Sequence, residues 1–391
     1  MSAANGQHRT PAWITGALAP FLAVRCGLVA IAWFAHRLPL LRTFEAQHLP
    51  LGAGWEHPYL FTPAWLLDVW GRWDAVWYVD IALNGYRVTA PLASAQQNVA
   101  FYPLYPLAMR AVALLFPASV APPVAALAAG VLLSNAAALG AVLLLHRHVQ
   151  RRFGDAAARR TVWALLAFPT SFFLSCAYTE AFFLLLAITC FDAAWNERWP
   201  LAGLAGGLLA LCRANGVVAI APLVVLALRG ARWRPWRATA GALAWASLVL
   251  VGFFIWWAWL WHLTGNPAAV GQAAAAWNRG FVMPWVTLLD FHSYPLLDPD
   301  RLALLLMGVL AVLSFFRLSI ADGVFAAAIM TPALCSAVLT SGARYVSVVF
   351  PAFVLVGTSS RHRLPWRLAF VACLAIQGLL FANWCRGQFI D

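Results

Sequence analysis

The chain has 391 residues, of which 63% are hydrophobic and 10% are charged, whereas about a quarter of the residues in a soluble domain are charged. This composition excludes an ordinary soluble protein and predicts a bundle of membrane-spanning helices, because the apolar runs have helical span lengths and no alternating pattern suggests a barrel. The net charge of +12 does not indicate nucleic-acid binding, since the arginines gather in short loops between apolar runs.

We expect an all-α polytopic membrane protein with about 11 transmembrane helices in one domain, residues 1–391. The first apolar run contains Arg25 and lacks a small-residue cleavage site, which predicts an uncleaved first span. The candidate spans are about 13–35, 122–146, 161–177, 180–195, 200–212, 216–228, 238–263, 301–317, 321–340, 345–358 and 367–384.

The arginine-rich loops predict the orientation of the bundle. Residues 146–160, 229–237 and 359–367 hold most of the arginine and are expected on the cytoplasmic side. Segment 36–121 then becomes an extracytoplasmic loop with juxtamembrane helices, and 264–300 also lies outside. Every basic residue is arginine, which suggests a GC-rich bacterial genome and hence the bacterial plasma (inner) membrane.

The first polar cluster is RWDAVWYVDIALNGY, residues 72–86. Asp74 lies between Trp73 and Trp77 at the start of an amphipathic stretch, so it is either a helix N-cap or a functional carboxylate at the membrane surface. Asp80 follows six residues later, on another face of a helix, and is expected to be structural.

The next two clusters combine aromatic residues with an acid. In NVAFYPLYPLA (98–108), Tyr102 and Tyr105 are either interfacial anchors or a stacking surface for a sugar or isoprenoid. Residues 104–116 are expected to form a short helix lying at the interface. In FPTSFFLSCAYTEAFFLLL, Tyr178 precedes Glu180, which either favours a helix dipole or marks a site.

Two short motifs place arginine at the predicted outer ends of spans. CRANG carries Arg213 and Asn215, and SGARY carries Arg344 and Tyr345. An arginine there needs an anion, and its planar guanidinium suits phosphate or carboxylate. We expect either a phosphate-headed lipid or an ion pair with Glu180.

The sequence gives no convincing metal site. DPD at 298–300 is expected to be a turn and a helix cap, with proline at an early helical position. No other carboxylate, histidine or cysteine group has ligand spacing. We therefore predict no metal and no cofactor.

Together these motifs resemble a known family. RWDAVWYVDIALNGY, AFYPLYP, FPTSFFLSCAYTEAFF, CRANG and ARYVSVVFPAF occur in the order found in PIG-V, the second mannosyltransferase of glycosylphosphatidylinositol-anchor assembly, and its bacterial relatives. The resemblance implies a GT-C polytopic glycosyltransferase that uses a polyprenyl-phosphate sugar donor on the non-cytoplasmic face. It also implies that the essential aspartate of the first outer loop is Asp74.

The leading hypothesis is an inverting transfer of a hexose, with mannose the first candidate, to a hydroxyl of a glycan or glycolipid. Asp74 would be the general base, and Arg213 and Arg344 would bind the donor phosphate. The alternative is a lipid or lipid-linked-sugar transporter that binds the same head group without chemistry. The residues expected to contact the substrates are Trp73, Trp77, Tyr102, Tyr105, Tyr178, Glu180, Asn215 and Tyr345.

Overall fold

The structure is a computed structural model that describes residues 13–39, 61–229, 235–359 and 363–390. Across these ranges the protein is helical, and the one β feature is an isolated antiparallel bridge between Phe281 and Ser336. Five helical stretches are long and apolar enough to cross a membrane. They are Ile14–Ala35 (η1, Ile14–Leu18, and α1, Ala19–Ala35), Pro122–Phe153 (α5), Trp236–Thr264 (α10, Trp236–Ala246, and α11, Leu248–Thr264), Pro299–Arg317 (α14) and Leu364–Cys385 (within α18, Arg363–Cys385).

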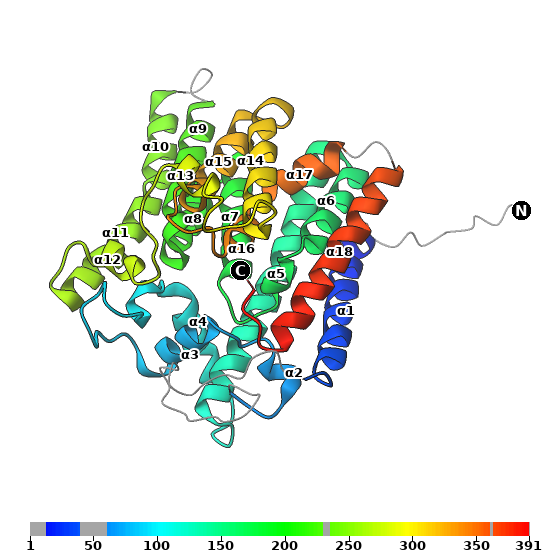
Figure 1. The fold of residues 1–391 in the computed structure, drawn as a ribbon. Coiled ribbons are helices and arrows are strands. Elements are labelled where there is room, and N and C mark those ends of the chain that lie inside the picture. Colours follow the sequence, from blue (N-terminus) through cyan, green and yellow to red (C-terminus); the bar gives the residue numbers. More distant parts are fainter. Residues whose placement is uncertain (1–12, 40–60, 230–234, 360–362, 391) are drawn as a thin grey trace, which may run out of the picture.

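Shorter helices pack between these five. They include α6 (Asp155–Ala167), α7 (Glu180–Trp195), α8 (Trp199–Cys212), α9 (Ile220–Arg229), α15 (Ile320–Leu334) and α17 (Phe350–Ser359). The connecting segments contain α2 (Trp65–Asp68), α3 (Ala75–Asn84), α4 (Leu104–Ala113), α12 (Ala269–Ala275), α13 (Pro284–Leu288) and α16 (Gly342–Val346). In Figure 1, α2, α3 and α4 lie at the lower end of the bundle, and α9, α10 and α17 reach its upper end.

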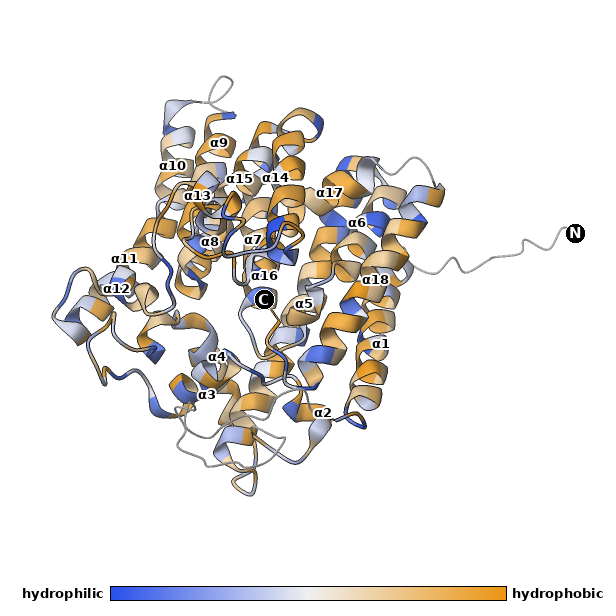
Figure 2. Ribbon diagram, viewed as in Figure 1, coloured by the Kyte–Doolittle hydropathy of each residue, from blue (hydrophilic) through white to orange (hydrophobic). Residues whose placement is uncertain are grey.

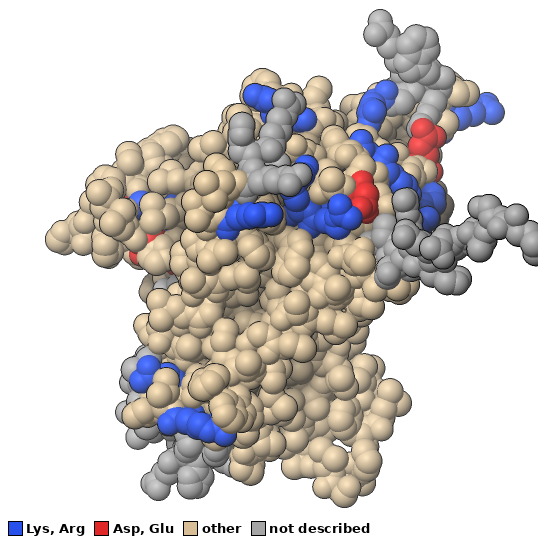
Figure 3. Space-filling model, turned by 90° about the vertical axis from the view of Figure 1, so that its right-hand side faces the viewer, with Lys and Arg blue, Asp and Glu red and all other residues tan. Residues whose placement is uncertain are grey.

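The surface of the bundle is that of a protein in lipid. Hydrophobic residues run along α1, α14 and α18 in Figure 2. Phe316 and Leu379 expose 79% and 63% of their surface, which would be unfavourable in water. In Figure 3 the charged residues of one face lie toward its two ends, with an uncharged band between them. These features support an integral membrane protein.

The predicted span 161–177 is wrong as one continuous helix. α6 ends at Ala167, and the chain then passes through a short 3-10 turn, Ser171–Leu174, before α7 begins. Pro169 explains the break, because proline disfavours helical geometry at Phe168 before it and cannot donate a backbone hydrogen bond. The irregular stretch delivers Tyr178 and Glu180 to the interior.

Two further predicted spans differ in the same way. The predicted span 321–340 is helical only as far as Leu334, shortly after Pro332. The predicted span 345–358 is divided between the end of α16 and α17. These irregular segments leave backbone groups and polar side chains inside the bundle, as occurs where a membrane protein builds a site.

The two short helices predicted at 200–212 and 216–228 are confirmed as α8 and as η5 (Ala214–Ala219) with α9. The helix breaks at Arg213, whose backbone is extended (φ −155°, ψ 156°). Gly216 permits the tight return, since a Cβ there would lie 2.0 Å from the carbonyl oxygen of Leu209. Arg213 is therefore held at an interior turn between two short helices.

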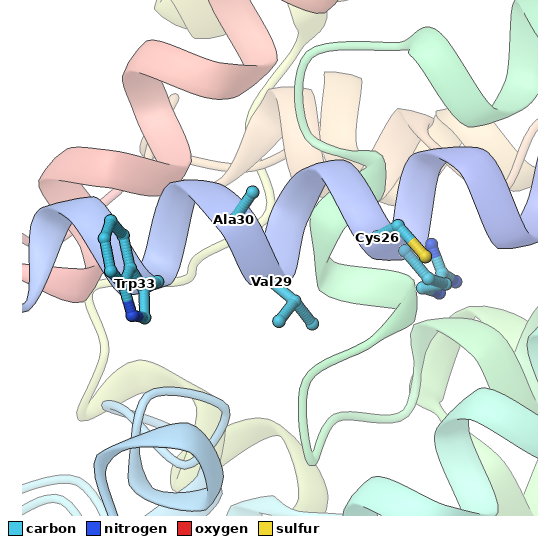
Figure 4. A pocket seen from close by; sticks show the side chains of 5 residues that line it. Cys26, Val29, Ala30 and Trp33 are labelled. Atoms are coloured by element: carbon cyan, nitrogen blue, oxygen red, sulfur yellow. The ribbon is translucent and has the colours of Figure 1, made fainter.

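Arg25 ties the first span to the bundle. Its Nε donates to Asn135 Oδ1 on α5 at 3.0 Å, and Asn135 Nδ2 donates to the Ser175 carbonyl at 3.2 Å. A groove beside α1 is lined by Arg25, Cys26, Val29, Ala30 and Trp33 (Figure 4). Apart from Arg25 and the free thiol of Cys26, this lining is apolar or aromatic.

A buried ionic network joins α5, α7 and α15. Arg152 makes two hydrogen bonds to Asp322, at 3.0 and 2.5 Å, and its Nη1 donates to His148 Nε2 at 2.9 Å. Because Nε2 accepts, the ring proton lies on Nδ1, which donates to Asp192 at 2.7 Å. The network therefore fixes three helices through satisfied charges.

We expect Asp322→Ala to destabilise the fold by about 3–5 kcal/mol, because Arg152 would keep its buried charge without its carboxylate. The melting temperature of the purified protein in detergent measures the change. Asp155→Ala is the matched control. The side chains of Asp155 and its partner Arg159 are 35% and 48% exposed, so this pair should contribute about 0–1 kcal/mol to the stability of the fold. Equal melting temperatures for both variants would show that the buried network is not stabilising.

Candidate active site

Asp74 lies immediately before α3, but its side chain does not cap that helix. Its Oδ2 instead lies 2.9 Å from Arg344 Nη1, and the side chain remains 21% exposed. The preceding Trp73 has φ of +53°, which is rare for a bulky residue and marks a constrained backbone. The cap interpretation is therefore wrong for the carboxylate, which is available for chemistry.

The backbone of Asp74 is anchored by Tyr178. The Tyr178 hydroxyl donates to the Arg72 carbonyl at 2.9 Å and accepts from the Asp74 N–H at 3.0 Å. Burial, and then the neighbouring Asp74 carboxylate, raises the pKa of Tyr178 well above its usual value. The hydroxyl therefore stays protonated and can make both bonds, so Tyr178 positions the carboxylate.

Asp74 belongs to a continuous chain of four charges. Arg344 Nε lies 3.3 Å from Glu180 Oε1, and Arg213 Nη1 donates to the same oxygen at 2.9 Å. The side chain of Glu180 is 1% exposed, and those of Arg344 and Arg213 are 6% and 11% exposed. The predicted ion pair with Glu180 is thus present, and it joins the acid of α7 to two arginines from distant segments.

Both arginines contact the same carboxylate oxygen of Glu180. Its Oε2 is buried without a hydrogen-bond partner. Thr179, the residue before α7, makes no side-chain cap bond, and its hydroxyl lies 3.4 Å from the Tyr78 hydroxyl. Asn215 from the same turn as Arg213 is 8% exposed, and its Oδ1 also lacks a partner. The centre of the cluster therefore holds polar groups that a bound molecule could satisfy.

The DPD segment positions Arg344 through the backbone of α16. Asp298 caps α14 by accepting from the Arg301 N–H at 3.0 Å, so the predicted turn and cap are confirmed. Asp300 is buried and accepts from the Ala343 N–H at 2.6 Å. Thr170 holds the other side of this residue by donating to the Ala343 carbonyl at 2.9 Å.

Tyr345 is surrounded by three guanidinium groups. Arg213, Arg279 and Arg344 have their Cζ atoms 4.9, 4.8 and 5.2 Å from the centre of its ring. Arg279 comes from the stretch between α12 and α13 and was not among the predicted residues. It lies in an irregular segment, and no sequence pattern indicated a contact between that segment and SGARY.

The predicted aromatic residues separate into two groups. Trp77 is half-buried and stacks on Phe101, with Trp277 against its edge. Tyr105 is fully buried and hydrogen-bonds Gly130 and Ser134.

Tyr102 lies in a separate apolar cluster, where its ring packs near Trp256. The structure therefore brings Trp77 near the surface of the site but leaves Tyr102 and Tyr105 in packing roles. Asp80 is structural, as expected, because it accepts from Asn84, Arg87 and Asn98.

The cluster offers a carboxylate base and cationic anion-binding groups in one place. The residues that the structure describes include no group of three or more His, Cys, Asp or Glu side chains able to hold a metal ion. The chemistry that the cluster itself supplies is proton transfer to Asp74 and stabilisation of an anion by arginine.

Comparisons with known structures give the same fold at low sequence identity. ArnT from Cupriavidus metallidurans bound to undecaprenyl phosphate is 16% identical with a TM-score of 0.53, over 92% of this chain and 63% of that one. ArnT in the apo state is 15% identical with a TM-score of 0.52, over 95% and 76%. The chain thus spans less than two thirds of the ArnT chain in the lipid complex.

A comparison with curated proteins gives no match. The family model described as mannosyltransferase (PIG-V) matches residues 55–231. That range contains Asp74, Tyr178, Glu180 and Arg213. The resemblance of this chain to the PIG-V mannosyltransferases is therefore confirmed over residues 55–231, in a fold shared with ArnT.

Proposed function

We propose that this protein transfers a hexose, with mannose the first candidate, from a polyprenyl-phosphate donor to a hydroxyl of a glycan or glycolipid. The observation that carries the proposal is the ion pair between Asp74 and Arg344 inside a cluster that also contains Glu180 and Arg213. A base and anion-binding groups side by side suit a reaction in which a hydroxyl loses a proton and a phosphate departs.

The proposed orientation places this cluster toward the extracytoplasmic side of a bacterial plasma membrane. In the sequence, α9 and α17 lead into the arginine-rich segments 229–237 and 359–367, and both helices reach the upper end of Figure 1, whereas α3, which follows Asp74, lies at the lower end. The positive-inside tendency assigns the upper end to the cytoplasm. In this proposal the five long helices together with α6, α7, α8, α9, α15 and α17 make about 11 passes, and α3 and α4 lie at the outer interface.

Asp74 is proposed to remove the proton of the acceptor hydroxyl. Its Oδ2 is engaged by Arg344, so Oδ1 is assigned to the acceptor. The hydroxyl oxygen then attacks the anomeric carbon of the donor, and the bond from that carbon to the phosphate oxygen breaks with inversion. The electron pair leaves with the polyprenyl phosphate, whose charge Arg344 and Arg213 stabilise without a metal.

Asp74→Asn should lower the rate of mannosyl transfer from polyprenyl-phosphate mannose by roughly 10²–10⁴-fold, because the amide cannot accept the proton. The measurement is initial rate with purified protein and a host glycolipid extract as acceptor. Asp80→Asn is the control: it removes the partner of Arg87, so it should reduce stability but not the turnover of the folded protein. Near wild-type turnover by Asp74→Asn would exclude the base assignment.

Arg344→Lys should lower kcat/KM for the same donor by roughly 10- to 100-fold, which corresponds to one charge-assisted hydrogen bond. A lysine offers one point charge, whereas Arg344 reaches Asp74 through Nη1 and Glu180 through Nε. Arg344→Ala should be more severe.

Arg87→Lys is the matched control for Arg344→Lys, since Arg87 also pairs with an aspartate, Asp80, but its side chain is 46% exposed. A lysine there should keep both the ion pair and the activity. Wild-type kcat/KM for Arg344→Lys would show that the two-armed contact is not needed for transfer.

A further inference from the structure

The charges around Tyr345 do not balance. Arg213, Arg279 and Arg344 contribute three positive charges, and Asp74 and Glu180 contribute two negative ones. The two acids are engaged by Arg213 and Arg344. Arg279 makes no ion pair with any residue that the structure describes, and its Nη2 donates only to the Thr340 carbonyl, at 3.3 Å.

The backbone on both sides of Arg279 is fixed. Trp277 packs edge-on against Trp77 and Phe101, with ring centres 5.9 and 5.6 Å apart. On the other side, the Gly280 carbonyl accepts from the Ala337 N–H at 3.0 Å, and the Val282 N–H donates to the Cys335 carbonyl at 2.9 Å.

Between these two anchors the chain turns at Asn278, which has φ of +56°. A left-handed backbone at a residue other than glycine is uncommon, and Asn adopts it more readily than most. The turn carries the half-buried side chain of Arg279 onto the ring of Tyr345. The position of this guanidinium is therefore built into the fold.

We propose that the guanidinium of Arg279 binds the phosphate of the polyprenyl-linked substrate; this inference rests on the proposed function. A guanidinium can place two parallel N–H groups on a phosphate, and it needs an anion when it is withdrawn from water. Arg213 and Arg344 each pair with an acid of the cluster, so Arg279 supplies the excess positive charge that attracts the phosphate, and the other two arginines then help to stabilise it.

The aromatic platform explains how three cations tolerate one another. Each guanidinium lies near the ring of Tyr345, and cation–π attraction offsets part of their mutual repulsion. A phosphate beside Arg279 would remove the remaining excess charge. Binding of the phosphate-bearing lipid should therefore depend on Arg279 more steeply than binding of the same lipid without phosphate.

The test compares undecaprenyl phosphate with undecaprenol as probes of the purified protein in detergent, with affinity followed by tryptophan fluorescence. Wild type should bind the phosphate form more tightly than the alcohol. Arg279→Gln should weaken binding of the phosphate form by roughly 10- to 100-fold and leave the alcohol unchanged. The affinity of Arg279→Lys for undecaprenyl phosphate should lie between those of wild type and Arg279→Gln. Arg110 is an exposed arginine on α4, and Arg110→Gln should bind both lipids as wild type does.

Wild-type affinity of Arg279→Gln for undecaprenyl phosphate would overturn the inference, as would an equal loss for both lipids. A lowered melting temperature of Arg279→Gln moves the decision to Arg279→Lys, which must then favour the phosphate form less than wild type does. Failure of the proposed function looks different: wild type would show the Arg279-dependent preference but transfer no sugar. If Arg279→Gln transfers sugar with an unchanged donor KM, the proposed role of Arg279 is contradicted and the proposed function of the protein stands.

Discussion

The Glu180 carboxylate is buried at the first residue of α7, and α7 contains no basic residue that could neutralise it. A carboxylate withdrawn from water needs both a cation and hydrogen-bond donors. The cations come from Arg213, between α8 and η5, and from Arg344 on α16. Arg344 then also holds Asp74. Pairing one buried acid therefore requires segments far apart in the sequence to end at the same place.

Helix breaks make that meeting possible. A helix that continued past Ala167 would carry Tyr178 along its axis, whereas Pro169 ends it and the following turn leads to Glu180. Gly216 allows the return after Arg213, and Ser341 has φ of +67° where α16 begins. The polar groups lie at these breaks because an unbroken helix in lipid satisfies its own backbone and offers none.

The sequence predicted the residue types of the site better than their partners. Asp74, Glu180, Arg213 and Arg344 stood out because charges within an apolar chain are costly. Their spacing did not show that Asp74 would pair with Arg344 rather than cap α3, since this depends on the placement of α16 by Asp300. Arg279 was missed because its contact with Tyr345 depends on tertiary anchoring of an irregular segment.

Aromatic residues were harder to assign than charges. Tyr102 and Tyr105 are residue types that often stack on sugars, yet both are buried, and the Tyr105 hydroxyl hydrogen-bonds Gly130 and Ser134. An apolar ring gains free energy in a core as well as against a ligand, so sequence alone does not separate the two. Buried charges are more informative because few environments tolerate them.

The central claim is that the cluster of Asp74, Arg344, Glu180 and Arg213 transfers sugar from a lipid-linked donor. The most direct measurement supplies purified protein with radiolabelled polyprenyl-phosphate mannose or with the corresponding nucleotide sugar, against a host glycolipid extract and in the presence of EDTA. The account predicts that label moves to the acceptor from the lipid donor alone. Label that moves only from the nucleotide sugar, or from neither donor, would contradict it.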